Sequence, residues 1–317
     1  MATRISIRGL FPAPSVPFDD HLEIIEPEFK KLIQTIGQAP GVGGVAVNGH
    51  AGEVTALTAT ERRRMIELAR ETLPSDKLVV AGVEDLSIPG TIEKLKEAKD
   101  AGAGAALMLP PFDYLPRRNL TQSWEAPYRY FSAVGEAVDL PFIIFEYPKS
   151  TGISYTTETL QRLAEIDNVV AIKDTVSDDQ LYQEHLETLS GKVAILTAID
   201  SPALLGYMLL GCDGALIGAS QIATEFWGRY TDHILRGEQA EAITVFKQRL
   251  LPIVTHIYSG RFNTPASHNS RAKEALVQLG IFSTAHVRPP ELDVTEIDRQ
   301  HILVGLERAH LKEKVLS

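Results

Sequence analysis

Strand-like and helix-like segments alternate along this 317-residue chain, and that alternation constrains the fold more than any other feature. The strand candidates are short, nearly continuous apolar runs, as expected for parallel strands covered on both faces. They are Gly9–Phe18, Val42–Gly49, Lys77–Val83, Gly104–Pro111, Pro141–Pro148, Val169–Thr175, Val193–Ile199 and Asp213–Ser220. Eight consecutive β/α units in one chain predict an α/β fold of the closed (β/α)8 type, a TIM barrel.

Amphipathic helical segments separate the strand candidates. The first has a single apolar stripe at the spacing i, i+3, i+4, i+7, formed by Phe29, Leu32, Ile33 and Ile36. The segments Thr58–Glu61 and Ser177–Gln180 have the pattern of a capped helix start. We expect further helices over Pro89–Gly102, Leu120–Asp139, Thr157–Asp167, Pro202–Gly211 and Ala223–Gly237.

A doubly wound open sheet is the alternative fold. It usually has fewer strands, and it needs a glycine-rich phosphate-binding turn after the first strand. Here the first strand leads into residues 15–20 (SVPFDD), which contain no glycine. Helical patterns without intervening strands follow the eighth unit, over Ala240–Ser259, Ala266–Gly280 and Thr295–Leu311. We therefore predict a barrel over residues 1–237 and a C-terminal three-helix extension over residues 238–317.

Composition narrows the range of partners. The net charge of −10 argues against broad binding to nucleic acid or to anionic membranes. The N-terminal residues lack the apolar core of a signal peptide, and no apolar stretch reaches the ~18 residues of a membrane span. The single cysteine, Cys212, excludes an intrachain disulfide and a metal site with several cysteines. We expect a cytoplasmic protein whose partner is a small molecule.

Lys173 is the strongest nucleophile among the residues at the strand ends, where a barrel carries its reactive groups. It follows the apolar run Val169–Ile172. An ammonium group is unfavourable inside a buried strand, but at the strand's end it can point into a cavity. Desolvation there lowers the pKa of a lysine from about 10.4 towards neutrality, so that the free amine can attack a carbonyl. Taken alone, the segment also allows a lysine whose amine reaches water.

Several motifs along nearly the whole chain resemble those of the dihydrodipicolinate synthase/N-acetylneuraminate lyase family of class I Schiff-base aldolases. They are Gly49–Glu53 (GHAGE), Leu57–Arg62 (LTATER), Pro148–Gly152, Ala171–Asp174, Gly211–Gly218 and Val287–Pro290. Phe145 lies 28 residues before Lys173, similar to the family's spacing between tyrosine and lysine. The resemblance implies a (β/α)8 barrel, a homo-oligomer (dimer or commonly tetramer), and an imine between Lys173 and a 2-oxo acid such as pyruvate.

This chemistry agrees with the residues present. A protonated imine at C2 withdraws electrons, so a carbanion at C3 is stabilised as an enamine and a bond at C3 can be made or broken. Because the lysine provides covalent catalysis, we expect no metal and no cofactor. The turn Gly49–Gly52 is expected to direct backbone N–H groups at the carboxylate of the oxo acid, unless its glycines serve loop geometry alone. For Glu53 we expect a supporting role.

Departures from the family pattern concern proton transfer. The family's catalytic tyrosine is Phe145 here, and a phenyl ring cannot relay a proton. Tyr147 lies two residues further and shares the same face if the strand continues. His50 stands where the family has a Ser or Thr hydroxyl, with Ala51 beside it. Because histidine titrates near neutrality, His50 and Tyr147 are the catalytic candidates beside Lys173, each with a structural role as the alternative.

Other departures concern the substrate. By resemblance, Asp113 replaces a tyrosine that the synthases contribute across a subunit interface. Ser150, next to Lys149, replaces the arginine that binds a second carboxylate. Asp200 remains where sugar-acid members carry two acidic residues. The predicted substrate-binding residues are Gly49, Ala51, Phe145, Asp113, Asp200, Leu216 and Gly218.

These departures argue against a true dihydrodipicolinate synthase and against a sialic acid lyase. Aldol cleavage of another 2-oxo acid is the first hypothesis, and dehydration of a 2-oxo-3-deoxy sugar acid through the same imine is the second. Two further alternatives remain. One is a barrel that binds an oxo acid without turnover, and the other is a phosphosugar barrel with a phosphate site at Gly218–Ser220.

Overall fold

The computed structural model describes residues 5, 7–112, 115–258 and 264–312. At its centre lies one parallel eight-stranded sheet with the strand order β1-β8-β7-β6-β5-β4-β3-β2. Between β1 and β2, Leu10 N donates to Gly41 O at 2.8 Å and Gly43 N donates to Leu10 O at 2.8 Å, so the sheet closes on itself. The predicted barrel is confirmed. The strands are β1 Gly9–Pro12, β2 Gly44–Val47, β3 Leu78–Val83, β4 Ala105–Met108, β5 Phe142–Glu146, β6 Val169–Asp174, β7 Ala194–Thr197 and β8 Gly214–Ile217.

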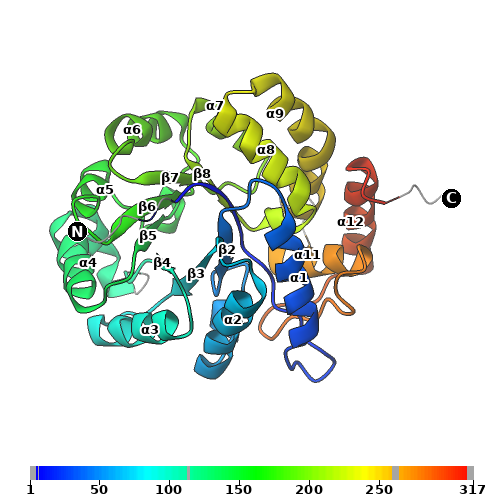
Figure 1. Cartoon of the computed structure of the whole chain (residues 1–317), viewed down its shortest axis with the longest axis horizontal. Helices are drawn as coiled ribbons and strands as arrows, with labels where there is room; N and C mark the ends of the chain where they lie inside the picture. The colour runs from blue at the N-terminus through cyan, green and yellow to red at the C-terminus, as the bar shows by residue number, and fades with distance from the viewer. Residues whose placement is uncertain (1–4, 6, 113–114, 259–263, 313–317) are drawn as a thin grey trace.

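Helices surround the strands, as Figure 1 shows. One follows each strand, which is the order that the alternation of apolar runs predicts. Thr58 and Glu61 form the expected capping box at the start of α2, whereas α6 is capped by Asp178 and not by the preceding serine. The barrel helices are α1 Glu26–Gln38, α2 Ala59–Thr72, α3 Ile88–Asp100, α4 Glu125–Ala137, α5 Thr157–Leu163, α6 Asp179–Leu189, α7 Leu204–Leu210 and α8 Thr224–Arg236.

The strands are buried on both faces, and the alternation of side chains along a strand decides which groups reach the barrel interior. In β6, Ala171 belongs to the interior apolar core, and Ile172 packs in the layer between the sheet and the helices. The same period sends Lys173 inward and Asp174 outward, where Asp174 is hydrogen-bonded to His185 of α6 at 2.7 Å. The sequence pattern of β6 therefore directs its lysine into the mouth of the barrel.

Several strands are shorter than the apolar runs that predicted them. The first is expected to reach Phe18 but ends at Pro12, because prolines at positions 12, 14 and 17 have no N–H to donate to a ladder. The fifth ends at Glu146, one residue before Tyr147. Apolar character thus extends from the strands into the loops at the mouth of the barrel.

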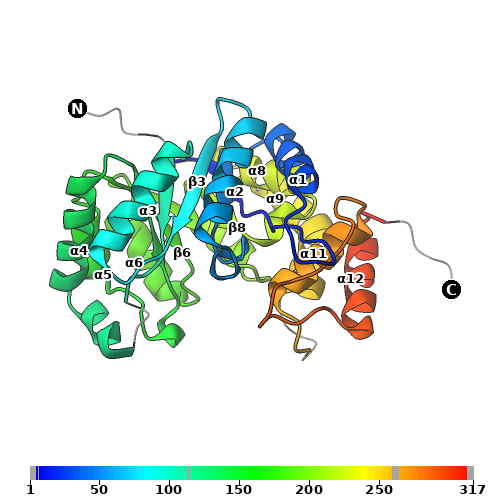
Figure 2. The ribbon, with the colours of Figure 1, turned by 90° about the horizontal axis from the view of Figure 1, so that it is seen from below.

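The C-terminal extension contains α9 Gln239–Val245, α10 Leu251–Ile253, α11 His268–Gln278 and α12 Glu296–Arg308. The predicted continuous helix Ala240–Ser259 is interrupted by π-helical turns at Phe246–Leu250 and Val254–Tyr258, on either side of a segment where Pro252 cannot donate an N–H bond. Figures 1 and 2 show α11 and α12 on one flank of the barrel, near α1. Lys31 of α1 donates to Gly280 O at 2.8 Å. No helix in the described part of the chain is long and apolar enough to cross a membrane.

Candidate active site

A cavity of about 260 Å³ lies at the carboxyl ends of the strands, where barrel enzymes bind their substrates. It is small beside the ~300–1,000 Å³ of common ligand sites, so its volume suits a small metabolite. Strands, strand-end loops and the C-terminal extension all contribute to its wall. The lining residues are Ala13, Ala46, Gly49, His50, Ala51, Leu107, Phe145, Lys173, Thr175, Ala198, Asp200, Leu216, Gly218, Tyr258 and His268.

Lys173 brings an amine into this cavity. Its neighbour across the β5–β6 ladder is Phe145, and the lysine Nζ lies 3.5 Å from the centroid of the Phe145 ring. Desolvation lowers the pKa of Lys173 to about 7, and the negative charge of Asp200 opposes that change. Because the pKa is close to neutral, a large fraction of this lysine is a free amine at pH 7, the form that attacks carbonyls.

Asp200 follows β7 and faces the same cavity. Its Oδ1 accepts a hydrogen bond from the backbone N–H of Ala219 at 2.8 Å, which orients the carboxylate. Burial raises the pKa of Asp200, while the Ala219 hydrogen bond and the positive charge of Lys173 favour its ionised form. Asp200 therefore introduces a hydrogen-bond acceptor near the amine without forming a close ion pair with it.

His50 and Tyr147 form a polar pair next to the Phe145 ring. The Tyr147 hydroxyl and His50 Nε2 are 2.6 Å apart and share a hydrogen bond. The Phe145 ring packs edge-on against Tyr147 with centroids 4.4 Å apart, and it is tilted by 45° against the His50 ring with centroids 5.4 Å apart. Although Tyr147 lies beyond the end of β5, its side chain still turns towards the mouth of the barrel. Two groups able to exchange protons thus flank the ring that Lys173 touches.

The turn after β2 forms one wall of the cavity. Glu53 N donates to His50 O at 3.0 Å, and Val54 N donates to Gly49 O at 3.2 Å. A Cβ atom at Gly52 would lie 2.9 Å from the backbone nitrogen of Asn48, so the turn requires glycine at this position. The backbone of residues 49–51 is consequently held against the cavity, which is the location expected for an anion-binding turn.

The C-terminal extension supports this turn from behind. Glu53 and Lys273 of α11 form a buried ion pair with Oε2 and Nζ 2.6 Å apart. Burial raises the pKa of Glu53 to about 7, and the charge of Lys273 opposes that rise. Asn269 Nδ2 donates to His50 O at 3.3 Å and to Glu291 Oε1 at 3.0 Å. Glu53 thus contacts α11, and α11 holds the turn that carries His50.

The predicted site residues gather at one place. All of them line the cavity except Tyr147, which reaches it through His50, and Asp113, which lies outside the described residues. Lys149 and Ser150, the positions that replace the family's arginine, are exposed in a short 3-10 turn. Lys149 borders a separate hollow, together with Ser154 and Thr156.

Sequence reasoning did not find Thr175, Tyr258 and His268, which also line the cavity. Thr175 comes directly after β6, so the rule for strand ends could have included it. Tyr258 and His268 belong to the C-terminal extension, and no local pattern in the sequence signals that this extension folds back over the barrel mouth. Within the described residues, no group of three or more His, Cys, Asp or Glu side chains is arranged to hold a metal ion.

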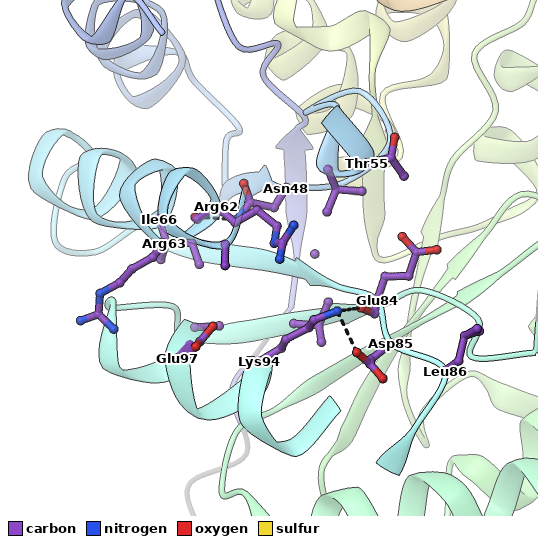
Figure 3. Close-up of a pocket in the computed structure, with 15 residues that line it drawn as sticks. Asn48, Thr55, Arg62, Arg63, Ile66, Glu84, Asp85, Leu86, Lys94 and Glu97 are labelled. Carbon is purple, nitrogen blue, oxygen red and sulfur yellow. Dashed lines mark hydrogen bonds and ion pairs between the residues drawn. The ribbon is translucent and has the colours of Figure 1, made fainter. Parts of the chain in front are cut away.

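A second cavity, of about 400 Å³, lies outside the barrel between α2, the end of β3 and α3, and six of its fifteen lining residues are charged (Figure 3). Lys94 lies in it, donates to Glu84 O at 2.5 Å and pairs with Asp85 at 2.9 Å. An ion-paired amine is stabilised in its charged form. Lys94 is therefore held by a carbonyl and a carboxylate, whereas Lys173 has no such contact within the described residues.

Comparison with known proteins agrees with this geometry. The sequence model of the dihydrodipicolinate synthetase family matches residues 6–309. A 4-hydroxy-tetrahydrodipicolinate synthase of Phenylobacterium zucineum is 30% identical over 305 residues, which cover 96% of this chain and 98% of that protein. One of Methylobacterium radiotolerans is 29% identical over 306 residues and 96% of each chain.

Solved structures show the same architecture. A dihydrodipicolinate synthase of Acinetobacter baumannii, complexed with pyruvate, has a TM-score of 0.84 and 26% identity, covering 97% of this chain and 100% of that one. A prophage protein of the dihydrodipicolinic acid synthase family from E. coli, also in complex with pyruvate, has a TM-score of 0.83 and 25% identity, covering 96% and 99%.

Proposed function

This chain belongs to the dihydrodipicolinate synthetase family and is a lyase of the class I aldolase type, and from this premise we propose that Lys173 forms a Schiff base with a 2-oxo acid. The observation that carries the proposal is the amine of Lys173. It faces a small cavity, contacts the ring of Phe145 at 3.5 Å, and has its pKa lowered by desolvation to about 7.

The reaction we propose is aldol cleavage. The free amine of Lys173 adds to the C2 carbonyl, and loss of water leaves a protonated imine. The proton of the C4 hydroxyl is removed, the C3–C4 bond breaks, and its electron pair moves into the imine to give an enamine and a free aldehyde. Protonation of C3 and hydrolysis of the imine then release pyruvate and restore the amine. The same steps in reverse condense pyruvate with an aldehyde.

The turn after β2 is the proposed binding site for the carboxylate of the oxo acid. Gly49 and Ala51 line the cavity, and no backbone carbonyl among the described residues accepts the Ala51 N–H. Convergent backbone N–H groups bind anions without a cationic side chain. On this proposal Phe145 and Leu216 contact the apolar part of the substrate, and Gly218 leaves space for it.

His50 and Tyr147 are proposed to move the protons that the family's tyrosine moves elsewhere. Their 2.6 Å hydrogen bond lets one group give up a proton while the other stabilises it. The pair flanks Phe145, the position at which that tyrosine is replaced. A structural role for the pair predicts a much smaller effect of substitution.

We infer that the substrate is not that of a dihydrodipicolinate synthase. The residues that replace the arginine for a second carboxylate are exposed and lie away from the cavity lining. Aldol cleavage of a 4-hydroxy-2-oxo acid is the first reaction to test. Dehydration of a 2-oxo-3-deoxy sugar acid is the second, because loss of a hydroxyl uses the same enamine. A barrel that binds an oxo acid without turnover is the third, and the phenyl ring at position 145 is what favours it.

Trapping of the imine tests the proposal. The purified protein is incubated with pyruvate and sodium borohydride, and peptide mass analysis locates the adduct. We expect one reduced pyruvyl group on Lys173, and none on Lys173→Ala. An unmodified Lys173 in a folded sample, or an adduct of equal yield on surface lysines, contradicts the proposal.

Turnover is measured separately with a panel of 4-hydroxy-2-oxo acids and 2-oxo-3-deoxy sugar acids. Release of pyruvate identifies an aldolase, and loss of water without pyruvate identifies a dehydratase. Trapping of pyruvate without turnover of any donor favours binding alone.

A homo-oligomer, dimer or tetramer, is also part of the proposal, because the family resemblance implies one. Light scattering during size-exclusion chromatography measures the mass directly. A monomer at micromolar concentration contradicts this part without affecting the imine chemistry.

A further inference from the structure

We propose that Tyr258, His268 and Asp200 bind the far end of the substrate and select 2-oxo acids whose side chain beyond C3 is hydroxylated and uncharged. The inference rests on the proposed function, because it assumes that Lys173 holds C2 of the oxo acid. The three side chains come from the loop after β7 and from the C-terminal extension, and all of them line the cavity of Lys173.

Tyr258 supplies a hydrogen-bond donor. The side-chain amide of Gln221 is oriented by Ser15 N, which donates to Gln221 Oε1 at 2.8 Å. In that orientation Gln221 Nε2 donates to the Tyr258 hydroxyl at 3.3 Å. The hydroxyl oxygen accepts this bond, so its own hydrogen can point to a ligand. Tyr258 is otherwise buried, with 8% of its surface exposed, and its position is therefore well determined by packing.

Asp200 and His268 supply the complementary groups. One oxygen of Asp200 is bound by Ala219 N at 2.8 Å, and a carboxylate has further lone pairs to accept a ligand hydroxyl. The ring of His268 lies 6.1 Å from the ring of Tyr258, centroid to centroid, and imidazole can donate or accept. Hydroxyl groups are both donors and acceptors, so a wall with this mixture matches a hydroxylated chain.

The charges in the cavity wall disfavour substrates that carry a second carboxylate. The described lining contains one lysine, Lys173, which holds C2 as the imine, and one acidic side chain, Asp200. Burial lowers the pKa of His268, which favours its neutral form. A second carboxylate on the substrate would face Asp200 without an arginine or a second lysine in the lining. Burying a charge without a partner is costly. The cavity therefore favours a neutral side chain over an anionic one.

The cavity also limits the size of the substrate's side chain. A Cβ atom added at Gly218 would lie 3.4 Å from both Ala51 Cβ and the Tyr258 hydroxyl, so the space between β8 and the extension is narrow. A short polyhydroxylated chain can pass this point, whereas a bulky or branched chain meets Ala51 and Tyr258.

The test compares two aldehydes as partners of pyruvate in the condensation direction, glyceraldehyde and succinic semialdehyde. Glyceraldehyde carries hydroxyl groups and no charge, whereas succinic semialdehyde carries a carboxylate and no hydroxyl group. We expect kcat/KM for glyceraldehyde to exceed that for succinic semialdehyde by at least about tenfold, the order expected when the polar groups of a site are matched or left unpaired by the substrate. Tyr258→Phe should raise KM for glyceraldehyde by about tenfold, and should change KM for succinic semialdehyde by less than about twofold.

Two further variants sharpen the test. Tyr230→Phe removes a buried tyrosine hydroxyl from α8 that is not part of the cavity lining, and should leave both KM values unchanged. Asp200→Asn should reduce the preference for glyceraldehyde, because it removes the repulsion of the carboxylate. Borohydride trapping of pyruvate is measured on every variant to report on the imine step alone.

Preference for succinic semialdehyde by the unmodified protein overturns the inference, as does an unchanged KM for glyceraldehyde in Tyr258→Phe. If trapping on Lys173 remains intact in those experiments, the proposed function stands and only the substrate class is wrong. If the unmodified protein shows no trapping, the proposed function is wrong, and this inference is then wrong as well because it depends on the imine.

Discussion

Two lysines of this protein, the half-buried Lys173 at the barrel mouth and the fully buried Lys273 in the extension, both lie over a phenyl ring but differ in their charged neighbours. Each amine lies over a phenyl ring, with Nζ 3.5 Å from the Phe145 centroid and 4.2 Å from the Phe18 centroid, respectively. Lys273 also pairs with Glu53 at 2.6 Å and donates to His286 O at 2.8 Å. For Lys173 the structure has no such contact within the described residues, and one side of it faces a cavity.

Burial alone therefore does not make a lysine nucleophilic. At Lys273 the ammonium form is compensated by a carboxylate and a carbonyl, so the amine serves structure. At Lys173 the charge is desolvated without a close anion, which lowers the pKa to about 7 and leaves a lone pair directed at open space. The two regions also depend on each other, because the Lys273–Glu53 pair holds the turn that carries His50.

The strongest test of this comparison changes each lysine to arginine. Lys173→Arg keeps a positive charge but cannot form an imine, so turnover should fall by on the order of 10⁴-fold and trapping should vanish. Lys273→Arg should keep the adduct on Lys173, because its role is electrostatic. Steady-state rates and adduct mass provide the measurement. Loss of trapping in a folded Lys273→Arg protein, with retention in Lys173→Arg, reverses the assignment.

The second test separates the partners of the buried ion pair. Glu53→Gln leaves the Lys273 ammonium without its carboxylate and should lower the free energy of unfolding by roughly 3–5 kcal/mol. The double variant with Lys273→Met removes both charges and should recover much of this loss. Urea denaturation measures the free energy of unfolding of the unmodified protein, of Glu53→Gln and of the double variant. Equal destabilisation in the single and double variants would show that the pair does not act as a unit.

The third test concerns His50, on the turn that the ion pair supports. If His50 carries a proton, His50→Ala should lower turnover by on the order of a hundredfold, while the yield of trapped pyruvate should change much less. Asn269→Ala serves as the control, since it removes the hydrogen bonds to the His50 carbonyl and to Glu291 but leaves the imidazole in place. A reduction in turnover below about threefold for His50→Ala excludes the proton-carrier role.

The smallest expected effect is on stability. The pKa of Lys173 is about 7 in the folded protein and about 10.4 unfolded, so the unfolded chain binds more protons between these values. Lys173→Met should therefore stabilise the fold at pH 7 by on the order of 2 kcal/mol, after allowance for partial exposure. The gain should be largest below pH 7 and disappear as the pH rises to about 10.4. Lys273→Met should destabilise instead, and thermal melts across pH distinguish the two.

Local patterns in the sequence were sufficient to predict the barrel and most of the residues that were expected to line its cavity. Apolar runs alternating with amphipathic helices are local patterns, and in a closed parallel barrel every strand delivers its carboxyl end to the same face. Side-chain alternation along β6 then sends Lys173 inward. Residues as distant as Gly49 and Gly218 could therefore be assigned to one site before any contact was known.

The way in which the extension completes that site depends on tertiary packing. The approach of Tyr258 and His268 to the cavity, and of Lys273 to Glu53, depends on how α11 packs against the barrel, which no strand or helix period encodes. The pairing of His50 with Tyr147 likewise depends on two loops meeting across the mouth. Local periodicity specifies which face of an element is buried, whereas contacts between loops and appended helices are set by the packing of the whole molecule.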